Sequence, residues 1–268
     1  MYLVEIFFNY NSNKKPADEP QRDAVTLVNQ IIEQWRYNGQ IIGREFPLYY
    51  DEMDNKRGFS VRVICPDHNA LLPYYNNENV NHALMTAAES GVYLHQIGLV
   101  AEDLNSNISH QAEDPQQVPT WQILYTSYLH TCSPLFSGDT FLPLPLYQTL
   151  QQHPSLSMDL IKWQENWQAC DQLQMNGAVL ESEALTQISS PESSLFKHGY
   201  HLCKEISDAT QIPTYYYLYH LGSRDHARER QRKCPRCKQD WLLEKPLFNL
   251  FHFKCDHCRL VSNLSWYD

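Results

Sequence analysis

Four cysteines near the C-terminus form two short pairs, Cys234 with Cys237 and Cys255 with Cys258. Each pair encloses two residues, and 17 residues separate the pairs, which is the spacing of a structural zinc site. A two-residue gap lets both sulfurs of a pair face one ion, and zinc takes four ligands at tetrahedral corners. The sequence therefore predicts one structural Zn²⁺ that is coordinatively closed and so has no position for catalysis.

The remaining chain offers few competing ligands. His252 and His257 lie inside this segment, but four cysteines already complete the tetrahedron, so we expect both histidines on the surface or in packing. The other four cysteines are widely scattered in apolar surroundings, where free thiols are usually buried and inert. They are Cys65, Cys132, Cys170 and Cys203.

Positive charge gathers around the cysteine pairs. Residues 224–259 hold ten Lys and Arg against five acids, a formal +5, so the rest of the chain carries −15. Four thiolates on one Zn²⁺ would lower the local value to about +3. The asymmetry indicates an anionic partner, and phosphate contacts would give affinity without sequence specificity. The candidate contacts are Arg228, Arg230, Arg232, Lys233, Arg236, Lys238 and Arg259. A solvated segment with ordinary charges remains the alternative.

The elements around the pairs predict a small zinc ribbon over residues 223–268, with strand-like runs at Trp241–Leu243 and Phe248–Phe253. Just before it, Pro213–His220 holds four tyrosines in five positions, a pattern typical of a strand. Two interpretations stay open. The tyrosines could be a stacking platform for bases, or a core strand that attaches the ribbon to its neighbour.

The N-terminal segment 1–102 has regular periodicity. Six elements follow the order strand, helix, strand, strand, helix, strand, which predicts a ferredoxin-like βαββαβ domain. It lacks the basic and aromatic pattern of RNA-binding domains. The expected elements are Leu3–Phe8, Pro20–Tyr37 (ended by Asn38-Gly39), Ile41–Tyr50, Gly58–Cys65, Glu78–Ser90 and Val92–Val100.

A polar, proline-containing stretch over 103–120 predicts a linker. Beyond it, 121–222 is expected to form a mixed α/β domain with a strand at Trp121–Leu129. Helices are predicted at Leu156–Met175 and from Ser190 through Ile206. The fold class is thus α+β, with a ferredoxin-like domain, a mixed α/β domain and a C-terminal zinc ribbon.

Composition narrows the class of protein. The net charge of −10 argues against a protein that coats nucleic acid over its whole surface. The N-terminal apolar run is too short for a signal peptide, and no stretch reaches membrane-spanning length. We therefore expect a soluble, cytoplasmic protein in which thiols stay reduced. Motifs for phosphate-binding loops, serine hydrolases and zinc proteases are absent from the sequence.

Three stretches together resemble a family of uncharacterised bacterial proteins, described as containing a zinc ribbon and suspected of binding nucleic acid. They are Pro213–His220, Cys234-Pro235-Arg236-Cys237 and the ending Cys255-Asp256-His257-Cys258-Arg259-Leu260-Val261-Ser262-Asn263. The similarity continues upstream through Ser133–Tyr147. The resemblance implies metal ligation by the four paired cysteines. It also implies further cysteines near Phe136–Thr140, where this chain has only Cys132.

Three functions follow as hypotheses. The first is a non-enzymatic zinc-ribbon protein that contacts RNA, DNA or a nucleoprotein machine through Arg228–Arg259. The second is an adaptor that uses the ribbon to dock on a protein partner. The third, an enzyme with a site between the first two domains, has the least support, because no group in the sequence is assigned an acid–base role.

Overall fold

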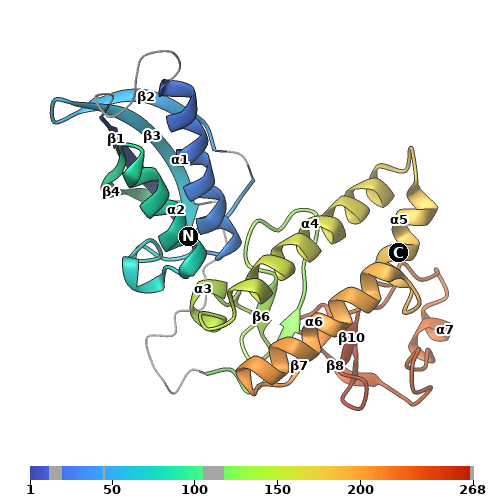
Figure 1. Ribbon diagram of the computed structural model, residues 1–268. Coiled ribbons are helices and arrows are strands. Elements are labelled where there is room, and N and C mark those ends of the chain that lie inside the picture. Colours follow the sequence, from blue (N-terminus) through green and yellow to red (C-terminus); the bar gives the residue numbers. More distant parts are fainter. Residues whose placement is uncertain (12–19, 45, 105–117, 266–268) are drawn as a thin grey trace. The chain divides into compact units, whose positions relative to one another are not determined.

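The computed structural model describes residues 1–11, 20–44, 46–104 and 118–265 (Figure 1). Most of the predicted linker, and the last three residues of the ribbon, therefore lie outside the described residues. The chain divides into two compact units. Unit 1 comprises Met1–Gln111, Thr131–Ser133 and Pro143–Met158, and unit 2 comprises Ala112–His130, Pro134–Leu142 and Asp159–Asp268. The ribbon and the segment before it belong to one compact unit and share one sheet.

Unit 1 is a four-stranded antiparallel sheet in the order β2-β3-β1-β4, with α1 and α2 packed on one face (Figure 1). Its elements are β1 Tyr2–Tyr10, α1 Pro20–Tyr37, β2 Leu48–Met53, β3 Lys56–Cys65, a 3₁₀ turn η2 Pro73–Tyr75, α2 Glu78–Glu89, β4 Val92–Glu102 and the short α3 Leu146–Thr149.

Alternation along the strands places one set of side chains on the helix-covered face. Alternate residues of β1, Val4, Ile6 and Phe8, join alternate residues of β3 and the apolar side of α1 in one core. Trp35, at the end of α1, is completely buried. The helical spacing of the α1 residues therefore determines the face that packs on the sheet.

The third predicted element begins later than expected. Only an isolated bridge joins Ile42 to Ile64, and β2 starts at Leu48 rather than Ile41. Gly43 lies in the left-handed region at φ 115°, and Pro47 has no amide hydrogen for a sheet bond. The apolar residues between Ile41 and Tyr50 look like one strand in the sequence, so the late start of β2 was not predicted.

Unit 2 is a mixed six-stranded sheet in the order β6-β5-β7-β10-β9-β8. Its elements are β5 Gln122–Leu124, β6 Leu135–Ser137, α4 Pro154–Asn176 (which begins in unit 1), α5 Glu181–Ser189, α6 Ser194–Thr210, β7 Thr214–Tyr217, α7 His226–Arg230, β8 Leu242–Leu247, β9 Phe251–Cys255 and β10 Leu260–Ser262.

The predicted helix from Ser190 is wrong in its start. α6 begins at Ser194, because the Ser193 hydroxyl accepts the amide hydrogen of Phe196 at 3.0 Å and caps the helix. No helix was predicted at Glu181–Ser189. This helix, α5, buries only Ala184 and Ile188, which is too few apolar residues to give a helical pattern in the sequence. The predicted strand at Trp121–Leu129 shrinks to β5, which ends at Leu124.

The tyrosine strand β7 lies in the core. It pairs in parallel with β5 on one side and with β10 on the other. Tyr215, Tyr216 and Tyr217 are 7%, 0% and 3% exposed, so their rings offer no free face to a base. The stacking-platform interpretation is therefore wrong. The strand instead joins the ribbon to the preceding segment, as the alternative interpretation held.

Close packing of α4 and α6 on β7 depends on one glycine. A Cβ added to Gly199 of α6 would approach Trp163 Nε1 within 2.3 Å and the Tyr216 ring within 2.5 Å. Both aromatic side chains are fully buried. Gly199 therefore lets the helix lie against two of the largest side chains of this core.

Candidate metal centre

The four paired cysteines converge at one point of unit 2. Their sulfur atoms all lie within 4.8 Å of one another, and the Cys237 and Cys255 sulfurs are 3.6 Å apart. None of the eight cysteines forms a disulfide. Tetrahedral zinc with metal–sulfur bonds of ~2.3 Å would hold its sulfurs about 3.8 Å apart. The cluster therefore has the size and chemistry to hold one metal ion.

Both cysteine pairs lie in tight turns of the same kind. The residue directly after each pair, Lys238 in the first and Arg259 in the second, has a left-handed backbone with φ 62° and 48°. In the first turn the Lys238 amide donates to the Cys234 carbonyl at 2.9 Å. In the second, the Cys258 amide donates to the Cys255 sulfur at 3.4 Å. The hairpin of β8 and β9 separates the turns and brings them face to face.

The second turn is attached to the core of unit 2. The Tyr200 hydroxyl of α6 donates to the Cys258 carbonyl at 3.0 Å, and the Tyr215 hydroxyl of β7 donates to Asp256 at 2.7 Å. The Arg259 guanidinium donates to Ser207 of α6 at 3.1 Å. The sulfur cluster is therefore part of the six-stranded sheet and its helices.

The distinctive ending after the second cysteine pair has a structural explanation. Leu260, Val261 and Ser262 form β10, and all three are buried between β7 and β9. Asn263 then fixes the chain: its Oδ1 accepts from the His220 amide at 2.9 Å and the Tyr217 hydroxyl at 3.1 Å, and its Nδ2 donates to the His220 carbonyl at 2.6 Å. The sequence pattern thus reflects a central strand and its anchor.

Arg232 also contacts Asn263 and the end of β10. Its guanidinium donates to Ser262 Oγ at 3.1 Å and to the Asn263 carbonyl at 2.7 Å. The same group stacks over the rings of Phe253, at 4.3 Å from the centroid, and Trp241, at 5.1 Å. Burial lowers the pKa of Arg232 to about 10. This arginine is therefore committed to the interior of unit 2.

A histidine–glutamate pair lies beside Arg232. His220 Nε2 is 2.6 Å from a carboxylate oxygen of Glu229, and Ser223 donates both its amide and its hydroxyl to that carboxylate. Burial lowers the pKa of His220, with Arg232 acting in the same direction. Burial alone would raise the pKa of Glu229, but the hydrogen bond from His220 leaves it lowered. Neutral His220 donating to ionised Glu229 satisfies both shifts.

Environment also separates the pKa values of the cysteine ligands. A hydrogen bond from the Gln239 backbone lowers the pKa of Cys237 to about 7. Burial raises the pKa of Cys255 to about 11 and raises that of Cys258 further. Metal ligation requires thiolates, so metal binding would release protons from Cys255 and Cys258.

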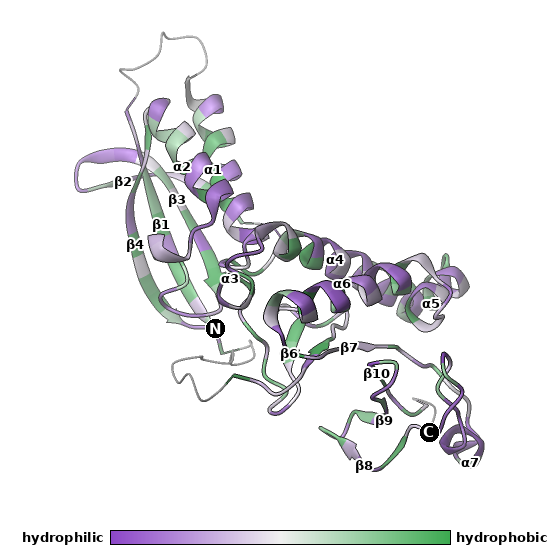
Figure 2. Cartoon of the chain, turned by 60° about the horizontal axis from the view of Figure 1, so that its bottom comes forward, coloured by the Kyte–Doolittle hydropathy of each residue, from purple (hydrophilic) through white to green (hydrophobic). Residues whose placement is uncertain are grey.

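The predicted phosphate contacts have different surroundings. Arg232 is internal, and Lys233 forms an ion pair with Asp240. Lys238 donates to the Pro235 carbonyl at 2.7 Å, and Arg259 bonds Ser207 as above. Arg236 stacks over the Tyr200 ring at 4.2 Å while remaining exposed. Arg228 and Arg230 are exposed on α7, which is hydrophilic along its length (Figure 2). Arg232 is half-buried, and its guanidinium donates hydrogen bonds within unit 2.

The remaining cysteines and histidines form no second cluster among the residues that the structure describes. Cys65, Cys132 and Cys203 are buried and Cys170 is half-buried, in agreement with inert thiols. Burial raises the pKa of Cys203 well above its ordinary value. His257 is exposed and His252 is half-buried, and neither joins the sulfur cluster.

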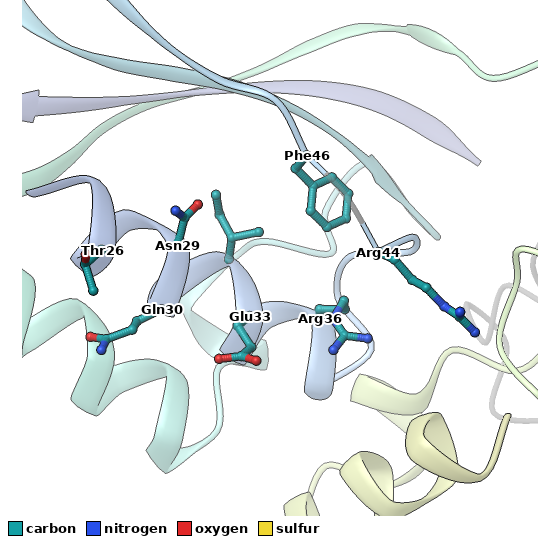
Figure 3. Close-up of a pocket in the computed structure, with 8 residues that line it drawn as sticks. Thr26, Asn29, Gln30, Glu33, Arg36, Arg44 and Phe46 are labelled. Atoms are coloured by element: carbon teal, nitrogen blue, oxygen red, sulfur yellow. The ribbon is translucent and has the colours of Figure 1, made fainter. Parts of the chain in front are cut away.

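Unit 1 contains a cavity of about 390 Å³ beside α1 (Figure 3). Side chains of α1 and of the segment before β2 line it, and none of them is a histidine, cysteine or serine. They are Thr26, Asn29, Gln30, Ile32, Glu33, Arg36, Arg44 and Phe46. Within the described helices, none is both long and apolar enough to span a bilayer.

Comparison with known proteins shows which family the chain belongs to. A protein of Haemophilus influenzae described as "Uncharacterized protein" is 52% identical over 266 residues, which cover 99% of both chains. The chain belongs to this uncharacterised bacterial family. A second Haemophilus influenzae protein with the same description is 51% identical over 198 residues, or 74% of this chain and 95% of its relative.

Three family models match consecutive segments of the chain. Each is described as a domain of unknown function: DUF8589 over residues 1–101, DUF2310 over 116–219 and DUF8594 over 223–268. No solved structure matches. The third segment contains the four cysteine ligands, and the second ends just after β7.

Proposed function

We propose that the cysteine cluster binds one structural Zn²⁺. Four thiols at tetrahedral spacing support this metal, and the four sulfurs leave no open position for water or substrate. The ion would tie the hairpin of β8 and β9 to β10. Metal analysis of the purified protein should give one zinc per chain, and Cys255→Ser should abolish it. Retention of zinc by that variant, or a different metal at full occupancy, would refute the assignment.

We propose, as the function that the geometry supports best, a non-enzymatic adaptor in which a zinc-stabilised unit 2 docks on a protein partner. The observation that supports this proposal is that three of the cations around the cysteine pairs make contacts within the unit. Arg232 holds the Asn263 anchor, Lys233 pairs with Asp240, and Arg259 bonds α6. A cluster of cations used for internal contacts is poorly suited to phosphate binding.

Nucleic-acid binding is the second candidate, because six of the predicted cations are exposed: Arg228, Arg230, Lys233, Arg236, Lys238 and Arg259. Purification from the native host separates the two functions. The adaptor proposal expects a stoichiometric protein partner, lost with Cys255→Ser. Co-purifying RNA or DNA, together with low-salt oligonucleotide binding that Arg228→Ala/Arg230→Ala removes, would overturn it. So few free cations would give a shallow salt dependence.

We also propose that unit 1 has a ferredoxin-like fold. The order β1-α1-β2-β3-α2-β4 and the antiparallel sheet β2-β3-β1-β4 support this assignment. The fold by itself names no function, since it hosts many. A cytoplasmic location is proposed on the eight free cysteines, which suit a reducing compartment.

A further inference from the structure

Large apolar side chains are exposed on two segments of unit 2, the loop after β5 and the end of α4 with its connection to α5. Leu129 is 75% exposed, Val179 65%, Leu180 61%, Met175 61% and Tyr128 42%. We call these five residues the apolar tip. Single exposed apolar residues are ordinary, but contiguous groups mark interaction sites.

Hydrogen bonds attach the loop of Tyr128 and Leu129 to α4, the helix that ends just before Val179 and Leu180. The Tyr128 amide donates to the buried carboxylate of Asp171 on α4 at 2.8 Å. Met175 lies one turn further along the same face of α4 as Asp171. Gln168 of α4 also donates to the His130 carbonyl at 2.7 Å. The loop that carries Tyr128 and Leu129 is therefore fixed to the end of the helix.

Leu180 has a backbone conformation and a helix position that leucine disfavours. Leu180 is the N-cap of α5, where its side chain can make no capping hydrogen bond, and its φ is 56°. Ser193 and Asn77 cap α6 and α2 with side-chain oxygens, as N-caps usually do. A left-handed leucine also costs about 1–2 kcal/mol. An exposed leucine at a position that favours asparagine indicates a role outside folding.

The charge near the apolar tip favours one kind of binding partner over others. Glu181 and Glu183 in the first turn of α5 are exposed beside Leu180. The chain outside residues 224–259 carries a formal −15. A second copy would bring these acids against their equivalents, and an anionic membrane would repel them. A basic partner has neither cost.

We propose that the apolar tip is the docking surface for a basic amphipathic helix of a partner protein, with apolar side chains on one face and Lys or Arg flanking them. The inference rests on the proposed adaptor function, because it supplies that function with its contact surface. The helix would cover Leu129 and Leu180 and place its cations against Glu181 and Glu183.

The test uses a synthetic amphipathic Leu/Lys peptide, a scrambled peptide of the same composition and a Leu/Glu analogue, each in an anisotropy titration. The protein is the full, zinc-loaded chain. Leu129→Ser/Leu180→Asn should raise the Kd for the Leu/Lys peptide at least about tenfold, because two leucines lose their burial. Asparagine suits both the N-cap and a left-handed backbone, so the melting temperature of this double variant should hold or rise. Met85→Gln, which alters an exposed methionine of unit 1, should leave the Kd unchanged.

Equal Kd values for wild type and the double variant, or equal binding of the scrambled peptide, would overturn the proposal. So would concentration-dependent dimerisation, or binding to anionic vesicles, that the double variant abolishes. A native partner recovered equally by wild type and double variant would leave the adaptor function standing and remove only the apolar tip. Failure to recover any partner with the wild type would count against the adaptor function itself.

Discussion

Arg232 offers the sharpest test of the structure, because its sequence context and its surroundings predict opposite outcomes. As a phosphate contact on the surface, it could be replaced by alanine without loss of stability. In the structure, Arg232→Ala removes two hydrogen bonds to Ser262 and Asn263 and the stacking over Phe253 and Trp241.

The expected cost comes from those contacts. Hydrogen bonds to charged groups contribute about 1.5–3 kcal/mol each, and a desolvated cation–π contact up to ~2 kcal/mol. Desolvation of the guanidinium, which lowers the pKa of Arg232 to about 10, offsets part of this gain. We expect Arg232→Ala to destabilise unit 2 by about 3 kcal/mol, which corresponds to roughly 10 °C in melting temperature for a unit of this size. Arg232→Lys should lose about half as much, since a single ammonium cannot reproduce the planar contacts.

Thermal unfolding followed by tryptophan fluorescence provides the assay, since Trp241 lies under the guanidinium. Hydrogen exchange over β9 and β10 locates the loss. Arg230→Ala, an exposed neighbour, is the matched control and should change stability by less than ~0.5 kcal/mol. If Arg232→Ala and Arg230→Ala unfold alike, the internal role assigned to Arg232 is refuted.

Three further predictions follow from the same packing. Gly199→Ala should destabilise unit 2 by about 2–3 kcal/mol in urea unfolding, because the added methyl group would clash with Trp163 and Tyr216. Gly98→Ala, whose added methyl group would have no contact closer than 4.0 Å, should be tolerated in the same assay. Tyr217→Phe should cost about 1 kcal/mol because it removes the hydrogen bond to Asn263, and an unchanged stability would contradict this prediction. The folded protein binds a proton at His220 less readily than the unfolded chain, so stability should fall as the pH drops through 6.5, and His220→Gln should flatten that part of the profile.

Several elements of the fold could be predicted because their pattern is local. α1 and α2 follow from helical spacing of apolar residues, and α2 occupies Glu78–Glu89 against a predicted Glu78–Ser90. The predicted helix over Leu156–Met175 is observed as α4, Pro154–Asn176. Boundaries set by single backbone features, such as Gly43 before β2 or the Ser193 cap of α6, were predicted less well.

The pairing of the ribbon with the segment before it could not be read from the sequence. β7 and β10, which lie on either side of the predicted boundary at 222/223, pair in one sheet within one compact unit. That pairing is non-local, and no periodicity within either strand specifies its neighbour. The four-tyrosine run illustrates the limit, since a platform and a core strand have the same sequence pattern.

The sequence by itself determined which four cysteines come together, because two residues between cysteines suffice to bring both sulfurs of a pair to one point. Only the tertiary structure decided how the neighbouring charges are used. Nothing in the sequence distinguishes Arg232 from Arg228. In the structure, the Arg232 guanidinium contacts Asn263, Ser262 and two aromatic rings, whereas Arg228 is exposed on α7. Burial and partners are set by strands that meet across more than thirty positions of sequence, as the 31-residue separation of Arg232 and Asn263 shows.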